Sequence, residues 1–371
     1  MTNNISLVTF VMGTRPEIIK LAPVIIRFKQ CKFLKVRIVL TGQHKEMAYS
    51  VMDLFNLRED KNLDLMQEKQ SLTHISTKVL KGLENDFNEN KPKLVIVQGD
   101  TSTAFAAALA AFYEKVPLAH VEAGLRTDNI MDPYPEEVNR RLISQIASIH
   151  FSPTSSAAKN LRSSGIKNNI FITGNTVIDS MHLLLHNKKS ELTKYIKLDK
   201  KKKVILVTVH RRENWGDRLR NIANSLLMIT EEHKDVTIII PMHKNKLIRK
   251  TLTNLLANKP SIILIEALPY DQLVELLSNC YLVLTDSGGI QEEAPSFGKP
   301  VLVLRETTER QEAIDSGTAM LVGTNTKYIF EQVSLLLKND NIYKSMSSKE
   351  NPFGDGKASQ KILNACLELL A

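Results

Sequence analysis

Short apolar runs that alternate with helical stretches are the feature that most restricts how this chain can fold. The runs are rich in Val, Ile and Leu, and helical patterns lie between them, for example at 16–28, 102–114 and 136–147. Continuous apolar strands joined by crossover helices are buried on both faces, which is typical of parallel sheets. The sequence therefore predicts an α/β fold of two Rossmann-like, doubly wound domains. The expected strands form two series: 7–12, 36–40, 94–98, 118–121, 150–152 and 170–173, and then 203–209, 237–240, 262–264, 281–285 and 301–304.

The length supports the same division, because 371 residues exceed what one ordinary hydrophobic core organises. The changeover lies between Gly174 and the lysine-rich segment near Lys200, so we expect one domain at 1–175 and another at 176–357. An amphipathic helix is expected at 358–370, and its pattern alone leaves open which domain it packs against.

Composition and charge exclude several classes of protein. No apolar run reaches the ~18–20 residues that a membrane-spanning helix needs, and the first residues lack the pattern of a secretory signal. Cys31, Cys280 and Cys366 are scattered, which fits a reducing cytoplasm and not a metal site. Much of the net charge of +9 sits in lysines between 188 and 203, beside one aromatic residue and no nucleic-acid motif. We therefore predict a cytoplasmic protein without a metal, nucleic-acid or membrane partner.

A glycine loop after the expected strand 281–285 predicts a nucleotide site. The loop contains Ser287, Gly288 and Gly289, and it is expected to lead into a helix whose first turns carry Glu292 and Glu293. Glycines let backbone N–H groups approach an anion, and a helix N-terminus adds partial positive charge, so a diphosphate fits here. A carboxylate in the helix can accept hydrogen bonds from a ribose diol. The alternative is an ordinary glycine-rich turn.

Ligands of doubly wound domains bind at the carboxyl ends of the strands, and two such domains would place them in the cleft between them. After the first strand, Arg15 and Lys20 lie about a turn apart and could both meet a phosphate or a carboxylate. The alternative there is a capped helix start with solvated charges. The loop lacks the GxGxxG fingerprint, so it does not indicate an NAD site.

Three carboxylates are expected at one rim of the first domain: Asp100, Glu122 and Glu136. Crowded acids raise one another's pKa, which lets an enzyme keep one acid protonated and another ionised near neutral pH. Asp100 could instead cap the helix that begins near Ser102, and all three could be unrelated caps.

In the second domain, His210 and Arg211 follow the first expected strand, and His243 follows the next one. Together these residues indicate a site that binds an anion and transfers protons, although either histidine alone is more often structural. The charged loop 305–310 could close over a sugar or a phosphate, or it could be an ordinary surface loop.

Taken together, the motifs resemble one family, the non-hydrolysing UDP-N-acetylglucosamine 2-epimerases, over almost the whole chain. Several of the matching motifs are long, and they follow the order of the family. They are GTRPEIIKLAPVI, TGQH, QGDTST, HVEAGLRT, PYPEEVNRRL, FSPT, TGNTVID, VTVHRREN, TDSGGIQEEAP, GKPVLVLRETTER and GTAMLVGT.

The resemblance implies two Rossmann-like domains arranged as in GT-B glycosyltransferases, a C-terminal helix at 358–371 that returns to the first domain, and a homodimer. It implies a UDP-sugar substrate and no NAD or other cofactor. The reaction it implies is reversible conversion of UDP-N-acetylglucosamine (UDP-GlcNAc) to UDP-N-acetylmannosamine (UDP-ManNAc), for surface polysaccharide precursors. The steps are anti elimination of UDP to 2-acetamidoglucal and syn re-addition.

The resemblance also assigns roles to residues. The acid/base carboxylates are Asp100, Glu122 and Glu136, with His210 as the catalytic histidine. The residues that bind UDP or the substrate are Arg15, Lys20, Arg211, His243, Ser287, Gly288, Gly289 and, at the ribose, Glu293. A second UDP-GlcNAc, acting as an activator as in some bacterial members, would meet Gln43, His44 and Gln70.

One departure from the family is Gln311, where a proline usually follows the TTER segment. Proline fixes φ, so its replacement suggests a looser loop. Two other functions stay open: a GT-B glycosyltransferase with a UDP-sugar donor, and an epimerase of UDP-2,3-diacetamido sugars. The opening GTRPE motif favours UDP-GlcNAc over the diacetamido sugars.

Overall fold

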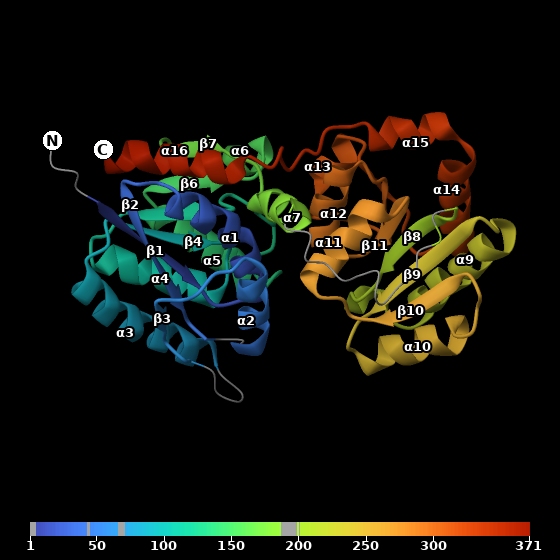
Figure 1. Ribbon diagram of the computed structural model, residues 1–371, viewed down its shortest axis with the longest axis horizontal. Coiled ribbons are helices and arrows are strands. Elements are labelled where there is room, and N and C mark those ends of the chain that lie inside the picture. The colour runs from blue at the N-terminus through green and yellow to red at the C-terminus, as the bar shows by residue number, and fades with distance from the viewer. Residues whose placement is uncertain (1–4, 43–44, 66–70, 187–198, 200) are drawn as a thin grey trace. The chain divides into compact units, whose positions relative to one another are not determined.

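The computed structural model describes residues 5–42, 45–65, 71–186, 199 and 201–371. Its contacts divide the chain into two compact units, Met1–Leu183 with Phe353–Ala371 (unit 1) and Leu184–Pro352 (unit 2) (Figure 1). This division falls inside helix α7 (Thr176–His186), and the domain boundary at 175–176 stays a prediction. None of the helices within the described residues combines the length and hydropathy that a bilayer-spanning segment requires.

Unit 1 is built on a seven-stranded parallel sheet in the order β3-β2-β1-β4-β5-β6-β7. The chain runs outward from β1 to β3 on one side and then from β4 to β7 on the other side. The two directions meet between β1 and β4, which is the topological switch point of this sheet. The strands are β1 (Ser6–Met12), β2 (Leu34–Leu40), β3 (Lys61–Asn62), β4 (Leu94–Gln98), β5 (Leu118–Val121), β6 (Ile149–Ser152) and β7 (Ile170–Ile172).

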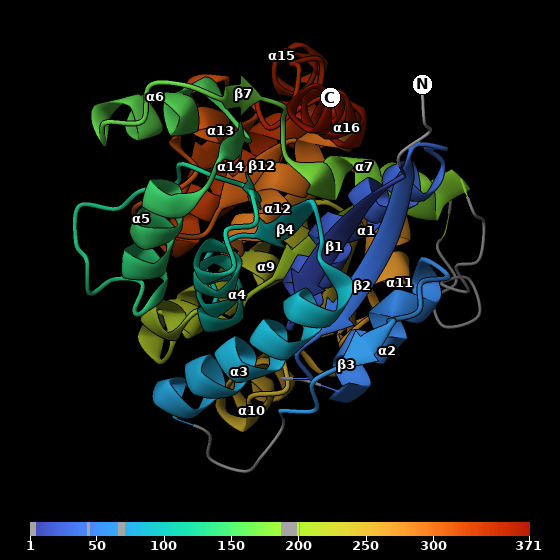
Figure 2. The same cartoon turned by 90° about the vertical axis from the view of Figure 1, so that its left-hand side faces the viewer.

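Helices cover both faces of this sheet. Successive side chains of a strand point to opposite faces, and here consecutive residues are apolar, so both faces must be buried. Phe10 of β1 meets Phe28 of α1 edge to face, with ring centroids 5.3 Å apart. Its neighbour Val11 belongs to the apolar cluster formed with α3, α4 and α5. Figure 2 shows these three helices side by side in one layer. The helices of unit 1 between the strands are α1 (Arg15–Lys29), α2 (Lys45–Leu54), α3 (Leu72–Asn90), α4 (Ser102–Tyr113), α5 (Glu136–Ile146) and α6 (Ser155–Ser163).

The last helix, α16 (Ala358–Leu370), packs on α1 and belongs to unit 1 (Figure 1). Its first turn is held by Asp179 of α7, whose carboxylate accepts hydrogen bonds from Ala358 N (3.2 Å), Ser359 N (2.9 Å) and Ser359 Oγ (2.6 Å). A carboxylate at a helix N-terminus satisfies N–H groups that have no partner within the helix. The chain therefore completes unit 1 with residues that follow all of unit 2.

Unit 2 repeats the plan with a six-stranded parallel sheet in the order β10-β9-β8-β11-β12-β13, so its switch point lies between β8 and β11. Helices α9, α10 and α14 share one apolar cluster with the sheet. The strands are β8 (Lys203–Thr208), β9 (Val236–Met242), β10 (Ile262–Glu266), β11 (Leu282–Thr285), β12 (Val301–Val303) and β13 (Ala319–Leu321). The helices are α9 (Asp217–Glu232), α10 (Lys246–Leu256), α11 (Tyr270–Asn279), α12 (Gly288–Glu293), α13 (Gln311–Asp315), α14 (Thr326–Lys338) and α15 (Asp340–Ser347), with short 3₁₀ turns at Arg212–Asn214 and Ala294–Phe297.

The prediction of an α/β chain with two doubly wound sheets is confirmed. Each strand of the two expected series is present, with small shifts at its ends. Two edge strands were missed. β3 has two residues, both polar, and β13 has three, so neither forms an apolar run long enough to recognise.

Candidate functional site

At the switch point of unit 1, the loops that follow β1 and β4 are joined by a buried carboxylate. Glu17 accepts hydrogen bonds from Gly13 N (2.8 Å), Thr14 N (2.6 Å) and Thr101 Oγ1 (2.6 Å). Its side chain lies in the interior, and burial raises its pKa more than these hydrogen bonds lower it. Glu17 thus fixes the two loops from which Arg15 and Asp100 extend.

Lys20 and Glu122 form an ion pair beside these loops. The Nζ atom of Lys20 lies 2.5 Å from Oε1 of Glu122, and both side chains are largely buried. Gln98 donates a hydrogen bond to Oε2 of Glu122, and Asn175 Nδ2 lies 3.3 Å from Oε1. Glu122 itself has φ of +65°, a conformation that is uncommon outside glycine and that concentrates at functional sites. Lys20 thus meets a carboxylate of the protein itself.

Asp100 is paired with Arg140 and does not cap α4. Its Oδ2 atom lies 2.6 Å from Nη2 of Arg140, and Thr101 is the N-cap, accepting a hydrogen bond from Ala104 N at 3.0 Å. The capping alternative for Asp100 is therefore wrong. Burial is the main cause that raises the pKa of Asp100, whereas Arg140 lowers it and the nearby charge of Glu122 adds a further rise. Crowding contributes as predicted, but less than desolvation.

Glu136 lies apart from the contacts that link the other predicted acids. It is the first residue of α5 and is partly exposed. Its neighbour Glu137 is buried and pairs with Arg140 (3.3 Å) and Arg141 (2.6 Å). Because Arg140 contacts both Asp100 and Glu137, it couples the start of α5 to the loop after β4.

At the switch point of unit 2, a buried aspartate holds the loop after β8. Asp286, which directly follows β11, accepts hydrogen bonds from the backbone N–H groups of His210 and Arg211 (both 2.9 Å) and from Asn214 Nδ2 (3.0 Å). Its Oδ1 atom also lies 3.0 Å from Nδ1 of the His210 ring. Burial alone would raise the pKa of Asp286, but the hydrogen bonds from the His210 ring and from the two backbone N–H groups outweigh burial and lower it.

The two predicted histidines of unit 2 stack on each other. The ring centroids of His210 and His243 are 5.7 Å apart with an angle of 27° between the planes. Burial and the neighbouring His210 lower the pKa of His243. The structure thus brings together residues that follow β8, β9 and β11, which lie on adjacent strands of the sheet.

The glycine loop differs from its prediction in where the helix begins. Gly288 and Gly289 are the first two residues of α12, so the helix begins earlier than predicted, and Glu292 and Glu293 lie one turn in, at its end. Neither glycine has positive φ among the described residues, so close approach explains Gly288 better than backbone freedom. A Cβ atom there would lie 3.3 Å from Cζ of Arg310.

The loop after β12 is tied to α12 by side chains. Arg310 Nε donates to Glu292 at 2.8 Å, and Thr308 Oγ1 donates to Gln291 at 2.6 Å. Glu309 pairs with Arg305 at 2.7 Å and with Arg211 at 3.6 Å. Burial would raise the pKa of Glu309, but the hydrogen bond and charge of Arg305 dominate and lower it to about 2. These contacts order the segment before Gln311, which is itself the first residue of α13.

Glu293, the residue predicted to contact a ribose, is buried at the end of α12. Tyr270 Oη lies 3.3 Å from its Oε1 atom. A Cβ atom at Gly289 would lie 3.9 Å from the same Oε1 and 3.9 Å from Ser287 Oγ. The carboxylate therefore sits close to the first turn of the helix, where the predicted diphosphate loop lies.

Comparisons with known proteins show to which family the chain belongs. A family model described as UDP-N-acetylglucosamine 2-epimerase matches residues 27–367. The UDP-N-acetylglucosamine 2-epimerase of Escherichia coli (strain K12) is 46% identical over 363 residues, which cover 96% of each chain. The chain belongs to the UDP-N-acetylglucosamine 2-epimerase family.

Solved structures of proteins similar to this chain include ligand complexes. The UDP-GlcNAc 2-epimerase of Neisseria meningitidis, bound to UDP-GlcNAc, is 43% identical, with a TM-score of 0.88 over 98% of this chain and 100% of that one. The S. aureus MnaA–UDP co-structure is 40% identical, with a TM-score of 0.86 over 98% of this chain and 97% of that one. The prediction of the family from sequence motifs is therefore confirmed.

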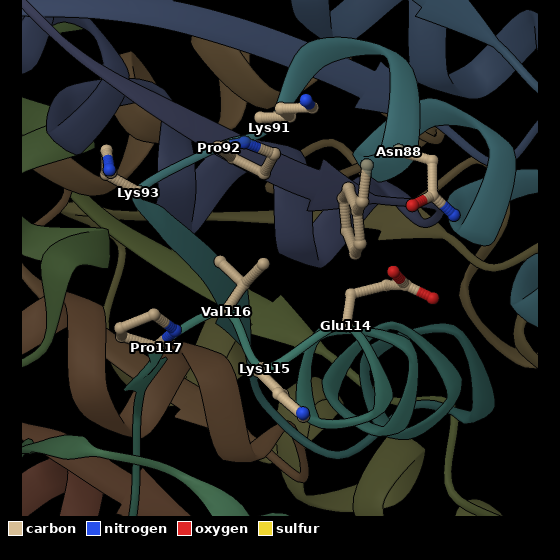
Figure 3. Close-up of a pocket in the computed structure, with 9 residues that line it drawn as sticks. Asn88, Lys91, Pro92, Lys93, Glu114, Lys115, Val116 and Pro117 are labelled. Atoms are coloured by element: carbon tan, nitrogen blue, oxygen red, sulfur yellow. The ribbon is translucent and has the colours of Figure 1, made fainter.

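A separate cavity of about 370 Å³ lies at the amino ends of two central strands of unit 1 (Figure 3). It is lined by the segments that enter β4 and β5, including Lys91, Lys93 and Glu114. Ligands of doubly wound sheets bind at the carboxyl ends of strands, whereas this cavity lies at the amino ends. None of the residues predicted for the family's site lines it.

Some predictions cannot be compared with the structure. Gln43, His44 and Gln70, the predicted contacts of an activator, lie outside the described residues. Within the part of the chain that is described, no group of three or more His, Cys, Asp or Glu residues is arranged to hold a metal ion.

Sequence reasoning missed two buried carboxylates that organise the site, Glu17 and Asp286. Glu17 had a recognisable signal, because Thr14-x-x-Glu17 has the spacing of a capping box. The structure forms the half of that box in which Glu17 accepts from Thr14 N. Asp286 had no such signal, because its partner His210 is 76 residues away and meets it only through the pairing of β8 with β11.

Proposed function

We propose that the chain interconverts UDP-GlcNAc and UDP-ManNAc without hydrolysing them. The observation that carries the proposal is the cluster of Asp100, Glu122 and Lys20 at the switch point of unit 1, in a chain of this family. Asp100 and Glu122 are close enough for the charge of Glu122 to affect the pKa of Asp100. A protein that only binds a nucleotide sugar has no need for a carboxyl group with a raised pKa next to a carboxylate that is ion-paired with a lysine.

The reaction that we propose begins with removal of the C2 proton by a carboxylate. The electron pair of the C2–H bond forms the C1–C2 double bond while the C1–O bond breaks, giving 2-acetamidoglucal and UDP. UDP then adds back to C1 as a proton reaches C2 on the other face. One acid must be ionised and a second protonated at the same time, which Asp100, Glu122 and Glu136 supply between them.

We assign binding of UDP to unit 2. His210, Arg211, His243, Ser287, Gly288 and Gly289 would stabilise the charge that develops on the departing diphosphate, and Glu293 would accept hydrogen bonds from the ribose. In unit 1, Arg15 and Lys20 would assist the substrate. The UDP-GlcNAc and UDP complexes of the Neisseria and S. aureus relatives support UDP-sugars as ligands here.

Incubation with UDP-GlcNAc in deuterated water tests the proposal. We expect UDP-ManNAc to form and deuterium to appear at C2 of the recovered nucleotide sugars, measured by NMR and mass spectrometry. If neither the product nor the isotope appears, the chain is not an epimerase of this sugar.

The same assay separates the alternatives. A hydrolysing enzyme would release free ManNAc with UDP, whereas a GT-B glycosyltransferase would release UDP only with an acceptor and would leave C2 without deuterium. Turnover of a UDP-2,3-diacetamido sugar in preference to UDP-GlcNAc would move the chain to the related substrate class.

We also propose a homodimer that is activated by a second molecule of UDP-GlcNAc, as the family resemblance implies. Light scattering coupled to size-exclusion chromatography measures the mass of the assembly, for which we expect twice the 41.8 kDa of the chain. Addition of a trace of UDP-GlcNAc to a reaction started from UDP-ManNAc should accelerate it, and substitution of Gln43 or Gln70 should remove that acceleration.

A further inference from the structure

The starting observation is the number of donors that surround Asp286. Its side chain is fully buried, and its two oxygens accept from two backbone N–H groups and from Asn214 as well as contacting the His210 ring. A carboxylate surrounded by donors is held in its ionised form, and an ionised carboxylate can only accept hydrogen bonds. The ring nitrogen that faces it must therefore carry the proton.

That nitrogen is Nδ1 of His210, which lies 3.0 Å from Oδ1 of Asp286. Neutral imidazole carries one proton, so a proton on Nδ1 leaves the lone pair on Nε2. The His210 side chain is 39% exposed while Asp286 is fully buried, so the ring edge that turns away from Asp286 is the accessible one.

In His243, which stacks on His210, the other ring nitrogen carries the proton. Its Nδ1 atom accepts a hydrogen bond from the backbone N–H of Asn245 at 3.2 Å. A nitrogen that accepts has no proton, so neutral His243 carries its proton on Nε2. The two stacked rings therefore differ in which nitrogen is a donor.

We propose that Asp286 is a positioning residue that fixes His210 as the Nδ1–H tautomer, so that the stacked pair offers one acceptor nitrogen and one donor nitrogen to the UDP-sugar. The Nε2–H of His243 donates to a diphosphate oxygen. Nε2 of His210 takes a proton from solvent, gives it to the departing diphosphate oxygen and takes it back as UDP adds to C1. Asp286 stabilises the imidazolium before the transfer. The inference rests on the proposed function for the identity of the ligand, but not for the tautomers.

The substitution Asp286→Asn tests the mechanism because the new amide fits the pocket in one orientation. Oδ2 of Asp286 accepts from three donors, His210 N, Arg211 N and Asn214 Nδ2. Oδ1 faces the His210 ring and shares only the longer contact, 3.1 Å, with His210 N, so the amide oxygen takes the place of Oδ2. The NH₂ group then takes the place of Oδ1 and donates to Nδ1 of His210. His210 is expected to change to the Nε2–H tautomer while the shape of the site is retained.

Long-range ¹H–¹⁵N spectra of the full chain labelled with ¹⁵N-histidine report the tautomer of each ring. We record them at alkaline pH, where histidines are neutral, and assign His210 and His243 from the missing signals of His210→Gln and His243→Gln. In the wild-type chain we expect Nδ1–H for His210 and Nε2–H for His243. In Asp286→Asn we expect His210 to change and His243 to stay, with kcat lowered about 10²-fold or more and KM nearly unchanged.

Thr208→Val is the matched control. Thr208 ends β8, and its hydroxyl pairs at 2.6 Å with that of Thr285, the residue before Asp286. We expect its spectrum and its kcat to resemble those of the wild-type chain.

Three results would overturn the inference: Nε2–H on wild-type His210, no tautomer change in Asp286→Asn, or a tautomer change that leaves kcat intact. The wild-type spectrum decides the first even if the variant does not fold. A wild-type chain that lacks turnover but has the two expected tautomers would remove the proposed function and leave the assignment of Asp286 standing.

Discussion

The two units share a topology, but the pKa values of the carboxyl groups at their sites are shifted in opposite directions. In unit 1, burial raises the pKa of Glu17 and Asp100 although each has hydrogen-bonding partners. In unit 2, donors outweigh burial around Asp286 at the switch point and around the more exposed Glu309 in the loop after β12, and the pKa of each falls, to about 2 for Glu309. The topology determines where polar side chains gather, whereas the balance between desolvation and donors determines which of them hold protons.

This difference in pKa matches the different roles that we propose for the two units. A carboxyl group whose pKa is raised can exchange protons near neutral pH. A carboxylate whose pKa is lowered by donors stays ionised there, so it can orient its neighbours but not exchange protons. The proposed acid/base carboxylates lie in unit 1, whereas the proposed diphosphate site, with His210 and its positioning aspartate, lies in unit 2. Four predictions test whether the contrast governs function and stability.

The largest effect is expected at the acids of unit 1. Asp100→Asn and Glu122→Gln should each lower turnover by about 10²-fold or more, because each removes a group that exchanges protons. His210→Ala in unit 2 should have an effect of similar size. Deuterium incorporation at C2 of UDP-GlcNAc is the measurement. Glu114→Gln, at the amino edge of the sheet in unit 1, is the matched control and should retain wild-type turnover; wild-type rates in all three site variants would remove the site assignment.

A second effect is expected at Glu17, which joins two loops in unit 1. Glu17→Ala leaves Gly13 N and Thr14 N without their acceptor, which costs about 1–3 kcal/mol of unfolding free energy. Glu17→Gln should lose less, because its amide oxygen can take the place of Oε2 and its NH₂ group can donate to Thr101. Urea unfolding of the three chains measures the order. Equal loss in both variants would mean that the charge, and not the hydrogen-bond geometry, is what the loops require.

The third prediction concerns pH and the buried histidines of unit 1. Burial lowers the pKa of His120 to about 3 and that of His150 to about 4, below the ordinary value of 6.5. A neutral group in the folded state that is protonated in the unfolded state destabilises the fold as the pH falls below 6.5. For His120 alone the loss between pH 7.5 and 5.5 is about 1.4 kcal/mol.

In unit 2, Asp286 and Glu309 have lowered pKa values, so the stability they contribute is lost only when the pH falls below the ordinary carboxyl range. His233 and His243 of unit 2 also have lowered pKa values, but the large shifts are those of His120 and His150 in unit 1. Hydrogen exchange at pH 5.5 should therefore show earlier loss of protection in unit 1 than in unit 2. His120→Gln, which can still donate to Gly99 O, should reduce that difference. Earlier loss of protection in unit 2 would contradict the difference that we expect between the units.

The smallest effect is expected in the glycine loop. A Cβ at Gly288 would approach Arg310 to 3.3 Å, whereas a Cβ at Gly289 meets its neighbours only at 3.9 Å. Gly288→Ala should therefore raise the KM for UDP-GlcNAc by a few fold, and Gly289→Ala should raise it less. Steady-state kinetics of the two variants provides the test. The reverse order would mean that the ligand approaches Gly289 more closely than the protein does.

Much of the fold could be predicted because buried parallel strands leave continuous apolar runs, as in Leu94–Gln98 and Leu282–Thr285. The start of α12 could not be predicted correctly, because two glycines normally indicate a turn, whereas here they begin a helix in which a Cβ at Gly288 would approach Arg310. The motifs located the candidate residues at strand ends. They could not reveal the Asp286–His210 or Arg140–Asp100 contacts, which depend on strand order and on α5 packing beside α4.

The attachment of α16 to Asp179 has a consequence for how the chain is made. During translation, all of unit 2 is synthesised before the residues that complete unit 1. Until then, the face of α1 that packs against α16 stays uncovered. Any stop codon that removes those thirteen residues of α16 would thus damage the half of the molecule that was translated first.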